Sequence, residues 1–276
     1  MHTTQTGICV AAVQMVSTTN VEQNLVAAAQ LIEEAARRGA RLVVLPEYFC
    51  LMGKRDRDKV AMREADGKGP IQDFLAEQAA RRQIWLFGGT LPLVAPDPER
   101  VFNSVLVFDP TGRRVARYDK IHLFSFRNGD EAYDEARTIA AGREPVSVQC
   151  TIGETSIRVG LSVCYDLRFP ELYRQLQGAD LNIVPAAFTA TTGQAHWEAL
   201  LRARAIENLC YVLASAQGGR HENGRATFGH SMLIDPWGEV LAVRPTGAGV
   251  VVGTVEPQRI ASCRSSLPAL AHRVLS

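Results

Sequence analysis

The sequence predicts an α/β protein in which helices pack outside an interior built largely of strands. Three observations lead to this fold class. Strand and helix patterns alternate in the first half of the chain, strand patterns cluster toward its end, and hydrophobic residues make up 46% of the 276 residues. The sequence shows no internal repeat, low-complexity segment or linker, so we expect a single domain over residues 1–276.

Short apolar runs bounded by glycine, proline or polar turns predict the strands. The run at 42–45 is wholly apolar, which is typical of a strand covered on both faces, and it ends at Pro46 because proline cannot donate to a sheet ladder. Residues 109–112, Asp-Pro-Thr-Gly, predict a hairpin turn. In chain order, the expected strands are 8–15, 42–45, 84–87, 102–108, 113–118, 145–150, 155–163, 181–185, 211–216, 229–235, 240–243 and 250–255.

Apolar residues at helical spacing, together with residues that suit helix ends, predict the helices. Asn20 suits the cap of the first helix and Gly39 its end, and Pro70 suits the first position of the second. We expect helices after Asn20, from Pro70, after Asp166 and over 194–209, and irregular polar or small-residue segments at 48–69, 125–136 and 186–194.

The composition limits the function and the compartment. Thirty basic and 29 acidic residues are scattered along the chain, so nothing in the charge favours nucleic acid or an anionic membrane as a partner. No apolar run approaches the length of a membrane span, and the polar stretch 1–7 lacks the apolar region of a signal peptide. Six cysteines without a CxxC pair or regular spacing fit a reducing compartment, so we expect a cytoplasmic protein.

The segment 158–173 carries the strongest candidate for chemistry. An apolar strand pattern ends at Cys164, and a helix pattern with Asp166 at its N-cap follows. A thiol facing the first turn of a helix lies near unsatisfied backbone N–H groups, which favour the thiolate. Two alternatives stay open on these residues alone: Cys164 is a small buried hydrophobe, or Ser162, on the same side of the strand, is the nucleophile.

Two charged residues also follow apolar strands. Because buried strands place their ends on one rim of a sheet, Glu47 and Lys120 can meet Cys164 there. A thiol needs a base to become a nucleophile, a carboxylate in a partly dry pocket can supply that base, and a lysine can stabilise an oxyanion. The alternative for each charged residue alone is ordinary solvation at the end of a strand.

Metal and cofactor signals are weak. His122, His196, His221 and His230 show no metal-ligand spacing. The glycines at 247, 249 and 253 precede a strand rather than a helix, so they do not match a dinucleotide fingerprint. We therefore expect neither a metal nor a cofactor.

Three motifs, in this order, resemble those of the nitrilase superfamily of carbon–nitrogen hydrolases: Leu45-Pro-Glu47, Asp119-Lys-Ile-His-Leu123 and Val163-Cys-Tyr-Asp-Leu-Arg-Phe-Pro170. The resemblance covers nearly the whole chain and implies a four-layer αββα sandwich. It also implies Glu47 as the base, Lys120 as the oxyanion stabiliser and Cys164 as the nucleophile. Glu135 looks like the family's second glutamate, which positions the lysine and the water, and the backbone N–H of Tyr165 would share the oxyanion.

Within the superfamily, further motifs resemble the amidases that act on deaminated glutathione, with the omega-amidases next. These motifs are Ala195-His-Trp-Glu198, Arg202-Ala-Arg-Ala-Ile206, Gly219-Arg-His221, Gly229-His-Ser-Met232 and Asp235-Pro-Trp-Gly238. This resemblance implies hydrolysis of a linear amide with a distal carboxylate to acid and ammonia through a cysteine thioester. Arg168 suits the carboxylate, although it can instead pair locally with Asp166 or Glu171. The residues expected to bind substrate are Tyr48, Phe124, Arg168, Phe188, Trp197, Arg220 and His221.

The resemblance also implies a homodimer, or a larger even assembly, that pairs through the helix over 194–209 and the helix after Cys164. Enzymatic alternatives are an omega-amidase that acts on α-ketoglutaramate, another amidase or nitrilase of the superfamily, and an acyl transferase. Two further alternatives come from other classes: a catalytically silent binding or scaffold protein, and a redox sensor with a resolving cysteine near Cys164.

Overall fold

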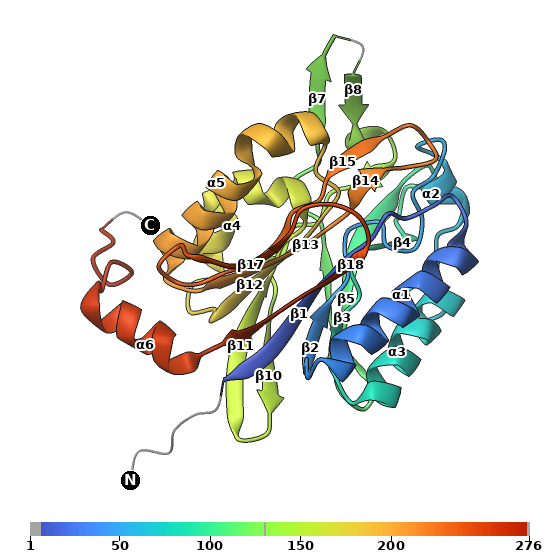
Figure 1. Cartoon of the computed structure of the whole chain (residues 1–276). Helices are drawn as coiled ribbons and strands as arrows, with labels where there is room; N and C mark the ends of the chain where they lie inside the picture. The colour runs from blue at the N-terminus through green and yellow to red at the C-terminus, as the bar shows by residue number, and fades with distance from the viewer. Residues whose placement is uncertain (1–6, 130, 275–276) are drawn as a thin grey trace.

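The computed structural model describes residues 7–129 and 131–274 as two β-sheets packed face to face between layers of helices (Figure 1). This arrangement is the four-layer αββα sandwich that the sequence resemblance implies. Residues 1–6, which make up most of the stretch without a signal-peptide pattern, lie outside the described residues. The expectation of a single domain over 1–276 stays a prediction.

The first sheet has the strand order β18–β1–β2–β3–β5–β4, and β6 and β9 also pair with β5. Strands β1, β2 and β3 run parallel, whereas β18 runs antiparallel to β1 and β5 runs antiparallel to β3. Its members are β1 (Ile8–Gln14), β2 (Leu42–Val44), β3 (Trp85–Phe87), β4 (Leu91–Val94), β5 (Val101–Phe108), β6 (Arg114–Asp119), β9 (Ile139–Ala140) and β18 (Gly249–Val255).

The second sheet has the order β10–β11–β12–β13–β16–β17, with β11, β12 and β13 parallel. Its members are β10 (Ser147–Ile152), β11 (Thr155–Leu161), β12 (Leu181–Ala186), β13 (Tyr211–Ala216), β16 (Ser231–Ile234) and β17 (Val240–Arg244). Two separate hairpins join β7 (Ser125–Asn128) to β8 (Glu131–Asp134) and β14 (Gly218–Arg220) to β15 (Ala226–Phe228).

Helices cover the outer face of each sheet (Figure 1). The first sheet packs against α1 (Val21–Arg37) and α3 (Pro70–Arg82), and the second against α4 (Pro170–Gln175) and α5 (Ala190–Asn208). A short α2 (Asp58–Ala61) precedes α3, and α6 (Pro257–Ser266) follows β18. As expected, the Asn20 side chain caps α1 by accepting the backbone N–H of Gln23 at 3.0 Å.

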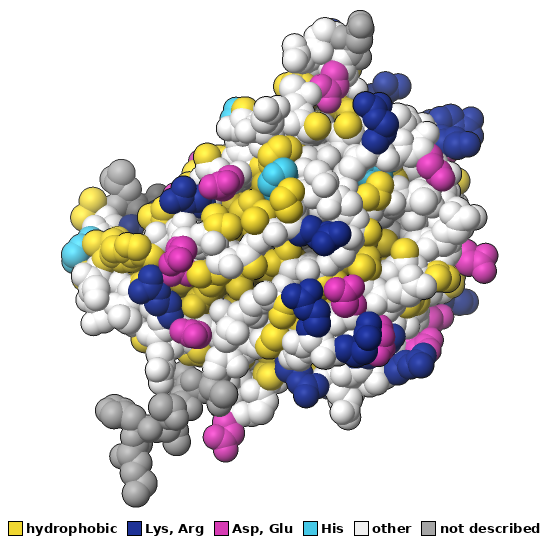
Figure 2. Space-filling model, in the orientation of Figure 1, with side chains coloured by type: hydrophobic (Ala, Val, Ile, Leu, Met, Phe, Trp, Pro, Cys, Tyr) yellow, Lys and Arg dark blue, Asp and Glu magenta, His cyan; other side chains and the backbone are white. Residues whose placement is uncertain are grey.

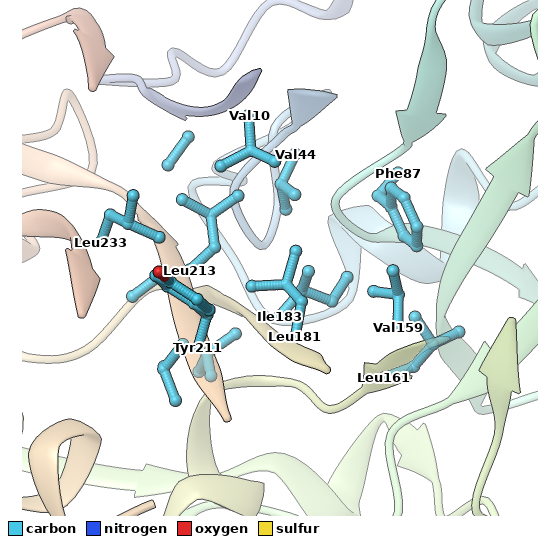
Figure 3. Close-up of a cluster of buried hydrophobic side chains, with 14 of the residues drawn as sticks. Val10, Val44, Phe87, Val159, Leu161, Leu181, Ile183, Tyr211, Leu213 and Leu233 are labelled. Carbon is cyan, nitrogen blue, oxygen red and sulfur yellow. The ribbon is translucent and has the colours of Figure 1, made fainter. Parts of the chain in front are cut away.

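Side-chain alternation along the strands builds the core between the sheets. Val10, Val44 and Phe87 of the first sheet point toward the second sheet, and Ile183 and Leu213 belong to the same buried cluster (Figure 3). The intervening positions of the first sheet pack against α1 and α3 instead. The strands at the centre of both sheets are therefore covered on both faces, which explains why their sequences are mostly apolar.

The structure corrects several expected elements. The polar stretches at 48–69 and 125–136 contain α2 and the β7–β8 hairpin, and α5 begins at Ala190, ahead of the expected 194. Asp166 is not a helix N-cap: residues Cys164–Arg168 form a 3₁₀ turn, and α4 begins at Pro170. The residue before a proline avoids helical backbone angles, so the helix cannot start earlier. No helix within 7–129 or 131–274 combines the length and apolar character needed to cross a membrane.

Candidate active site

Three segments that are distant in sequence meet at one rim of the sandwich. Glu47 follows β2, Lys120 follows β6, and Cys164 begins the turn after β11. The ammonium of Lys120 lies 2.9 Å from Glu47 Oε1, and the thiol of Cys164 hydrogen-bonds to the Glu47 carboxylate. The structure therefore brings together the three strand-end residues that the sequence singled out.

Lys120 is completely buried between two carboxylates. Its Nζ lies 2.9 Å from Glu47 Oε1 and 2.8 Å and 3.0 Å from the two oxygens of Glu135. Burial alone would lower the pKa of Lys120, but the charges of Glu135 and Glu47 raise it above its usual value. Burial would likewise raise the pKa of Glu135, yet the adjacent lysine lowers it. Lys120 and Glu135 thus stabilise each other's charged forms inside the protein.

Glu135 is fixed by its surroundings as well as by the lysine. The backbone N–H of Phe124 donates to Oε2 at 2.8 Å, and the hydroxyl of Tyr48 donates to Oε1 at 2.9 Å. The residue opens a 3₁₀ turn, Glu135–Arg137, directly after β8. The sequence motifs did not establish where Glu135 lies relative to the other site residues. In the structure, Glu135 contacts Lys120 from the side opposite Glu47.

The Glu47 carboxylate is held on all sides. Oε1 accepts a hydrogen bond from Asn103 Nδ2 at 2.9 Å, and Oε2 accepts the backbone N–H of Ala187 at 2.9 Å. Gln217 Nε2 donates to the Glu47 backbone carbonyl at 3.0 Å. A side chain with this many partners has little rotamer freedom, so it is pre-organised beside the thiol of Cys164.

Cys164 occupies a sharp turn and is buried. Its backbone φ of 49° lies in the left-handed region, which a non-glycine residue adopts rarely and which here turns the chain out of β11. Burial raises the pKa of the Cys164 thiol well above its usual value, the Glu47 charge raises it further, and Lys120 opposes both effects. The expectation of a thiolate favoured by a helix terminus is therefore wrong, because desolvation and the carboxylates outweigh the short 3₁₀ turn.

The carboxylate of Asp166 ties this turn to the lysine segment. Oδ2 accepts the backbone N–H of Val163 at 2.8 Å and the hydroxyl of Tyr118 at 2.7 Å. Oδ1 accepts the backbone N–H of His122 at 2.9 Å and lies 2.7 Å from Nδ1 of the same residue. One buried carboxylate thus links residues on either side of Lys120 to the turn that carries the cysteine.

Ser162, the rival nucleophile, is occupied elsewhere. Its hydroxyl donates to the carbonyl of Ile183 at 2.8 Å and is 2.8 Å from the hydroxyl of Tyr173. Its buried oxygen therefore serves the packing between strand and helix.

Two adjoining cavities open at this rim. An inner cavity of about 10 Å³, roughly the room that one water molecule needs, is lined by Cys164, Tyr165 and Phe188 among others. An outer cavity of about 420 Å³, within the range of small-molecule sites, is lined by Tyr48 among others. The residues common to both cavities are Phe124, Glu135 and Arg225. Tyr48, Phe124 and Phe188, three of the residues expected to bind substrate, thus line these cavities.

The other residues expected to bind substrate line neither cavity. Trp197 Nε1 donates to the carbonyl of His230, and the ring of His221 bonds to the Ser17 carbonyl and the Thr227 hydroxyl, so both are part of the internal packing. Arg220 is exposed on β14.

Arg168 does not form the local ion pair that was the alternative to its binding substrate. Its guanidinium lies 3.3 Å from His196 Nδ1 and stacks over the rings of Tyr165 and Phe188, with no ion pair to Asp166 or Glu171. It therefore supports the wall of the inner cavity from behind.

Sequence reasoning missed the aromatic Tyr133 and four cations that line the outer cavity, namely Lys54, Arg55, Lys59 and Arg225. The Asn223-Gly224 pair before Arg225 is a hairpin signal that would have predicted β14 and β15 and placed the arginine in the turn between them. Lys59 and Tyr133 lie in segments whose polar composition concealed α2 and β8. Among the described residues, no group of three or more His, Cys, Asp or Glu side chains is arranged to hold a metal ion.

Comparison with known proteins agrees with this geometry. The family model described as carbon-nitrogen hydrolase matches residues 9–265. The chain belongs to the carbon-nitrogen hydrolase family. It is therefore a hydrolase that acts on carbon–nitrogen bonds, and its three strand-end motifs lie within the matched residues.

Individual relatives of this carbon-nitrogen hydrolase cover nearly its whole length. A deaminated glutathione amidase from Synechocystis is 44% identical over 270 residues, 96% of this chain and 97% of that protein. The crystal structure of yeast Nit3, a member of the nitrilase superfamily, superposes with a TM-score of 0.86 at 30% identity, over 98% of this chain and 97% of Nit3. The C. elegans NitFhit structure gives a TM-score of 0.88 at 37% identity over 97% of this chain, which spans 65% of that protein.

Proposed function

We propose that this hydrolase is a cysteine amidase in which Glu47 is the general base, Cys164 the nucleophile and Lys120 the oxyanion-stabilising cation. The observation that carries the proposal is the buried ammonium of Lys120, bonded to Glu47 on one side and to Glu135 on the other. Two carboxylates and one ammonium cost free energy to bury together, and a cysteine hydrolase needs each of them at this place. A silent scaffold protein would have no use for such a cluster.

The raised pKa of the Cys164 thiol sets the first step. The thiol is protonated in the free protein, so Glu47 takes its proton as the sulfur attacks the amide carbon. The developing oxyanion is stabilised by Lys120 and by the backbone N–H of Tyr165. Glu135 holds the lysine in place and keeps it charged.

In the second half of the reaction, Glu47 acts first as an acid and then again as a base. Protonated Glu47 gives its proton to the leaving nitrogen, the C–N bond breaks, and a thioester to Cys164 remains. Glu47 then takes a proton from a water molecule that attacks the thioester carbon. The carboxylic acid leaves, and the thiol is regenerated by the proton that Glu47 carries.

We propose deaminated glutathione as the preferred substrate, because the Synechocystis relative of 44% identity carries that name. The outer cavity of about 420 Å³ has room for a molecule larger than a short primary amide. Deaminated glutathione is an amide of cysteinylglycine, so its hydrolysis releases that amine, whereas a primary amide such as α-ketoglutaramate releases ammonia. The assay must therefore measure the 2-oxo acid product in both reactions.

The proposed location and assembly follow from two features. All six cysteines are free, which agrees with a reducing cytoplasm.

The exposed hydrophobic residues Ile206, Trp237, Leu241 and Val243 come from α5 and from the β16–β17 hairpin. Hydrophobic side chains gather across the middle of this face, over the region of β17 (Figure 2). Such a surface favours a homodimer that pairs across α5 and its neighbours.

The proposed function is tested by comparing kcat/KM for deaminated glutathione, α-ketoglutaramate and an uncharged aliphatic amide. We expect hydrolysis of all three, with deaminated glutathione first. A preference for α-ketoglutaramate keeps the chemistry and assigns the protein to omega-amidases. A preference for the uncharged amide contradicts the acidic substrate, and the absence of turnover on any amide contradicts the amidase itself.

A further inference from the structure

Asn103 is a polar residue in an otherwise apolar row on one face of β5. Val101, Val105 and Val107 occupy alternate positions on the same face, and all three are completely buried. The Asn103 side chain is buried as well, so its amide needs partners inside the protein. Because a hydrophobic side chain would be easier to bury in this row, the amide points to a role other than packing.

The partners of Asn103 are two central groups of the candidate active site. Its Nδ2 donates to Glu47 Oε1 at 2.9 Å. Its backbone carbonyl accepts the N–H of Lys120 at 3.0 Å, and the ammonium of Lys120 donates to the same oxygen of Glu47 at 2.9 Å. A single residue of β5 therefore holds the carboxylate with its side chain and the lysine segment with its backbone.

The hydrogen bonds to the Glu47 carboxylate are divided unequally between its two oxygens. Oε1 accepts from both Lys120 and Asn103, which uses both of its lone pairs. Oε2 accepts the backbone N–H of Ala187 at 2.9 Å, which uses one lone pair. The second lone pair of Oε2 is therefore the position left for the Cys164 thiol, which also hydrogen-bonds to this carboxylate.

We infer that Oε2 of Glu47 takes the proton of Cys164, and that Asn103 is a positioning residue that keeps Oε1 occupied and Oε2 beside the thiol. The inference rests on the proposed amidase function and adds the atom that accepts the proton. During the attack, the S–H bond breaks and its proton moves to Oε2. The S–C bond forms, and an electron pair of the carbonyl group moves to the carbonyl oxygen. Oε2 then gives the same proton to the leaving nitrogen as the C–N bond breaks.

The physical reason for the amide is the soft terminal torsion of a glutamate side chain. Without Asn103, Lys120 would be the remaining donor to Oε1, and the carboxylate could rotate until Oε1 had a free lone pair. The proton acceptor would then no longer be fixed beside the thiol. A neutral amide prevents this rotation and adds no further charge to a cluster that already holds Glu47, Lys120 and Glu135.

The experiment removes the amide donor at position 103 and keeps a side chain that suits the row. The variants are Asn103→Leu, of similar shape, and Asn103→Val, which continues the valine row, so a folding defect in one does not decide the test. The matched control is Asn182→Leu, which removes another buried amide, bonded to Cys210 Sγ at the other end of β12 from Ala187. We expect both Asn103 variants to lower kcat for α-ketoglutaramate at least about tenfold, with KM within about threefold of wild type. The control should keep both values.

Alkylation of Cys164 by iodoacetamide gives a second readout that does not depend on turnover. The S–C bond forms as iodide leaves, and the thiol proton must go to a base. We expect the Asn103 variants to label Cys164 at least about fivefold more slowly than the wild type, as followed by peptide mapping. Asn182→Leu should label at the wild-type rate, and melting temperatures show that the compared variants are folded.

The two readouts separate this inference from the proposed function. Slower labelling in the Asn103 variants, without amide hydrolysis by the wild type, would keep the positioning role and contradict the amidase. Wild-type labelling in the folded Asn103 variants would overturn the positioning role while the amidase stands. Equal slowing in Asn182→Leu would overturn it too, because the loss of any buried amide would then have the same effect.

Discussion

The Asp166 carboxylate accepts the backbone N–H of His122 at 2.9 Å and thereby joins the turn of the nucleophile to the strand end of the lysine. Neither residue touches the thiol or the ammonium in the described contacts. Each lies two residues from the group that it positions. The distance between Cys164 and Lys120 is therefore set through a carboxylate that takes no part in the proposed proton transfers.

We predict that Asp166→Asn lowers kcat by about 10²-fold with little change in KM, because a misplacement of about 1 Å costs that much in rate. The matched control is Asp235→Asn, which removes another buried carboxylate that holds a turn far from the site. Both variants should lose thermal stability, but only Asp166→Asn should lose kcat. Equal kcat values for the two variants would make Asp166 a structural residue only.

Glu47→Gln and Lys120→Ala should both lose activity but differ in stability. Without Glu47, neither the thiol nor the water has a base. Without Lys120, the oxyanion loses a charged donor, which typically costs about 10²–10³ in rate. Lys120→Ala also leaves two buried carboxylates unpaired, at a cost of about 3–5 kcal/mol in the free energy of unfolding. Kinetic measurements give the loss of activity of each variant, and urea unfolding gives its loss of stability. A kcat/KM within about threefold of wild type for either variant would show that the substituted residue is not catalytic.

The lowered pKa of Glu135 predicts how stability depends on pH. Its folded-state pKa lies below its ordinary value of 4.5, so its contribution to stability is present above pH 4.5 and is lost as the pH falls below that value. The free energy of unfolding of Glu135→Gln should therefore fall less steeply than that of the wild type from pH 5 downward. The exposed Glu144→Gln is the control and should keep the wild-type slope. Parallel slopes for all three proteins would contradict the ionised cluster.

The proposed homodimer predicts that Ile206→Glu or Leu241→Glu lowers the molar mass in solution. Each variant places a charge on the exposed hydrophobic surface of α5 and β17. Light scattering at micromolar concentration should show a dimer or larger even assembly for the wild type and monomer for the variants. The exposed Val26→Glu on α1, on the opposite outer layer, is the control. A monomeric wild type would end the assembly proposal.

The sequence predicted the interior of this fold well, because buried strands have a strong local signal. Residues 42–45 are wholly apolar, residues 181–185 are apolar except for Asn182, and both segments form central strands. The segments that were missed have weaker local signals. The hairpin that carries Tyr133 is mostly polar, and Arg225 lies in the turn between β14 and β15.

The candidate site divides in the same way. Glu47 follows a buried strand, Cys164 follows a strand with a buried end, and Lys120 follows the partly exposed β6, so strand ends alone suggested their meeting. The prediction of a lowered pKa for the Cys164 thiol was wrong, because this pKa depends on burial and on the charge of Glu47. Local sequence determines neither of them. Arg168 was favoured because it is close to the cysteine in sequence, whereas the arginine in the cavity is 61 positions away.

Cys164→Ala should abolish turnover and leave the protein folded, since the thiol makes few packing contacts that an alanine methyl cannot replace. We expect a loss in kcat of at least about 10³-fold, with a near-native melting temperature. Cys164→Ser should also be nearly inactive, because Glu47 cannot make a hydroxyl as good a nucleophile as a thiol. Cys210→Ala, which removes another buried cysteine just before β13, is the control and should keep wild-type kcat.

The most direct test of the account is the mass of the protein during reaction with an activated ester of the substrate acid. Because the ester acylates faster than the thioester is hydrolysed, the intermediate should accumulate. Acid-quenched wild type should gain one acyl group, located at Cys164 by peptide mapping, and Cys164→Ala should gain none. Product formation without an acyl group on Cys164, or with one on another residue, would contradict the account.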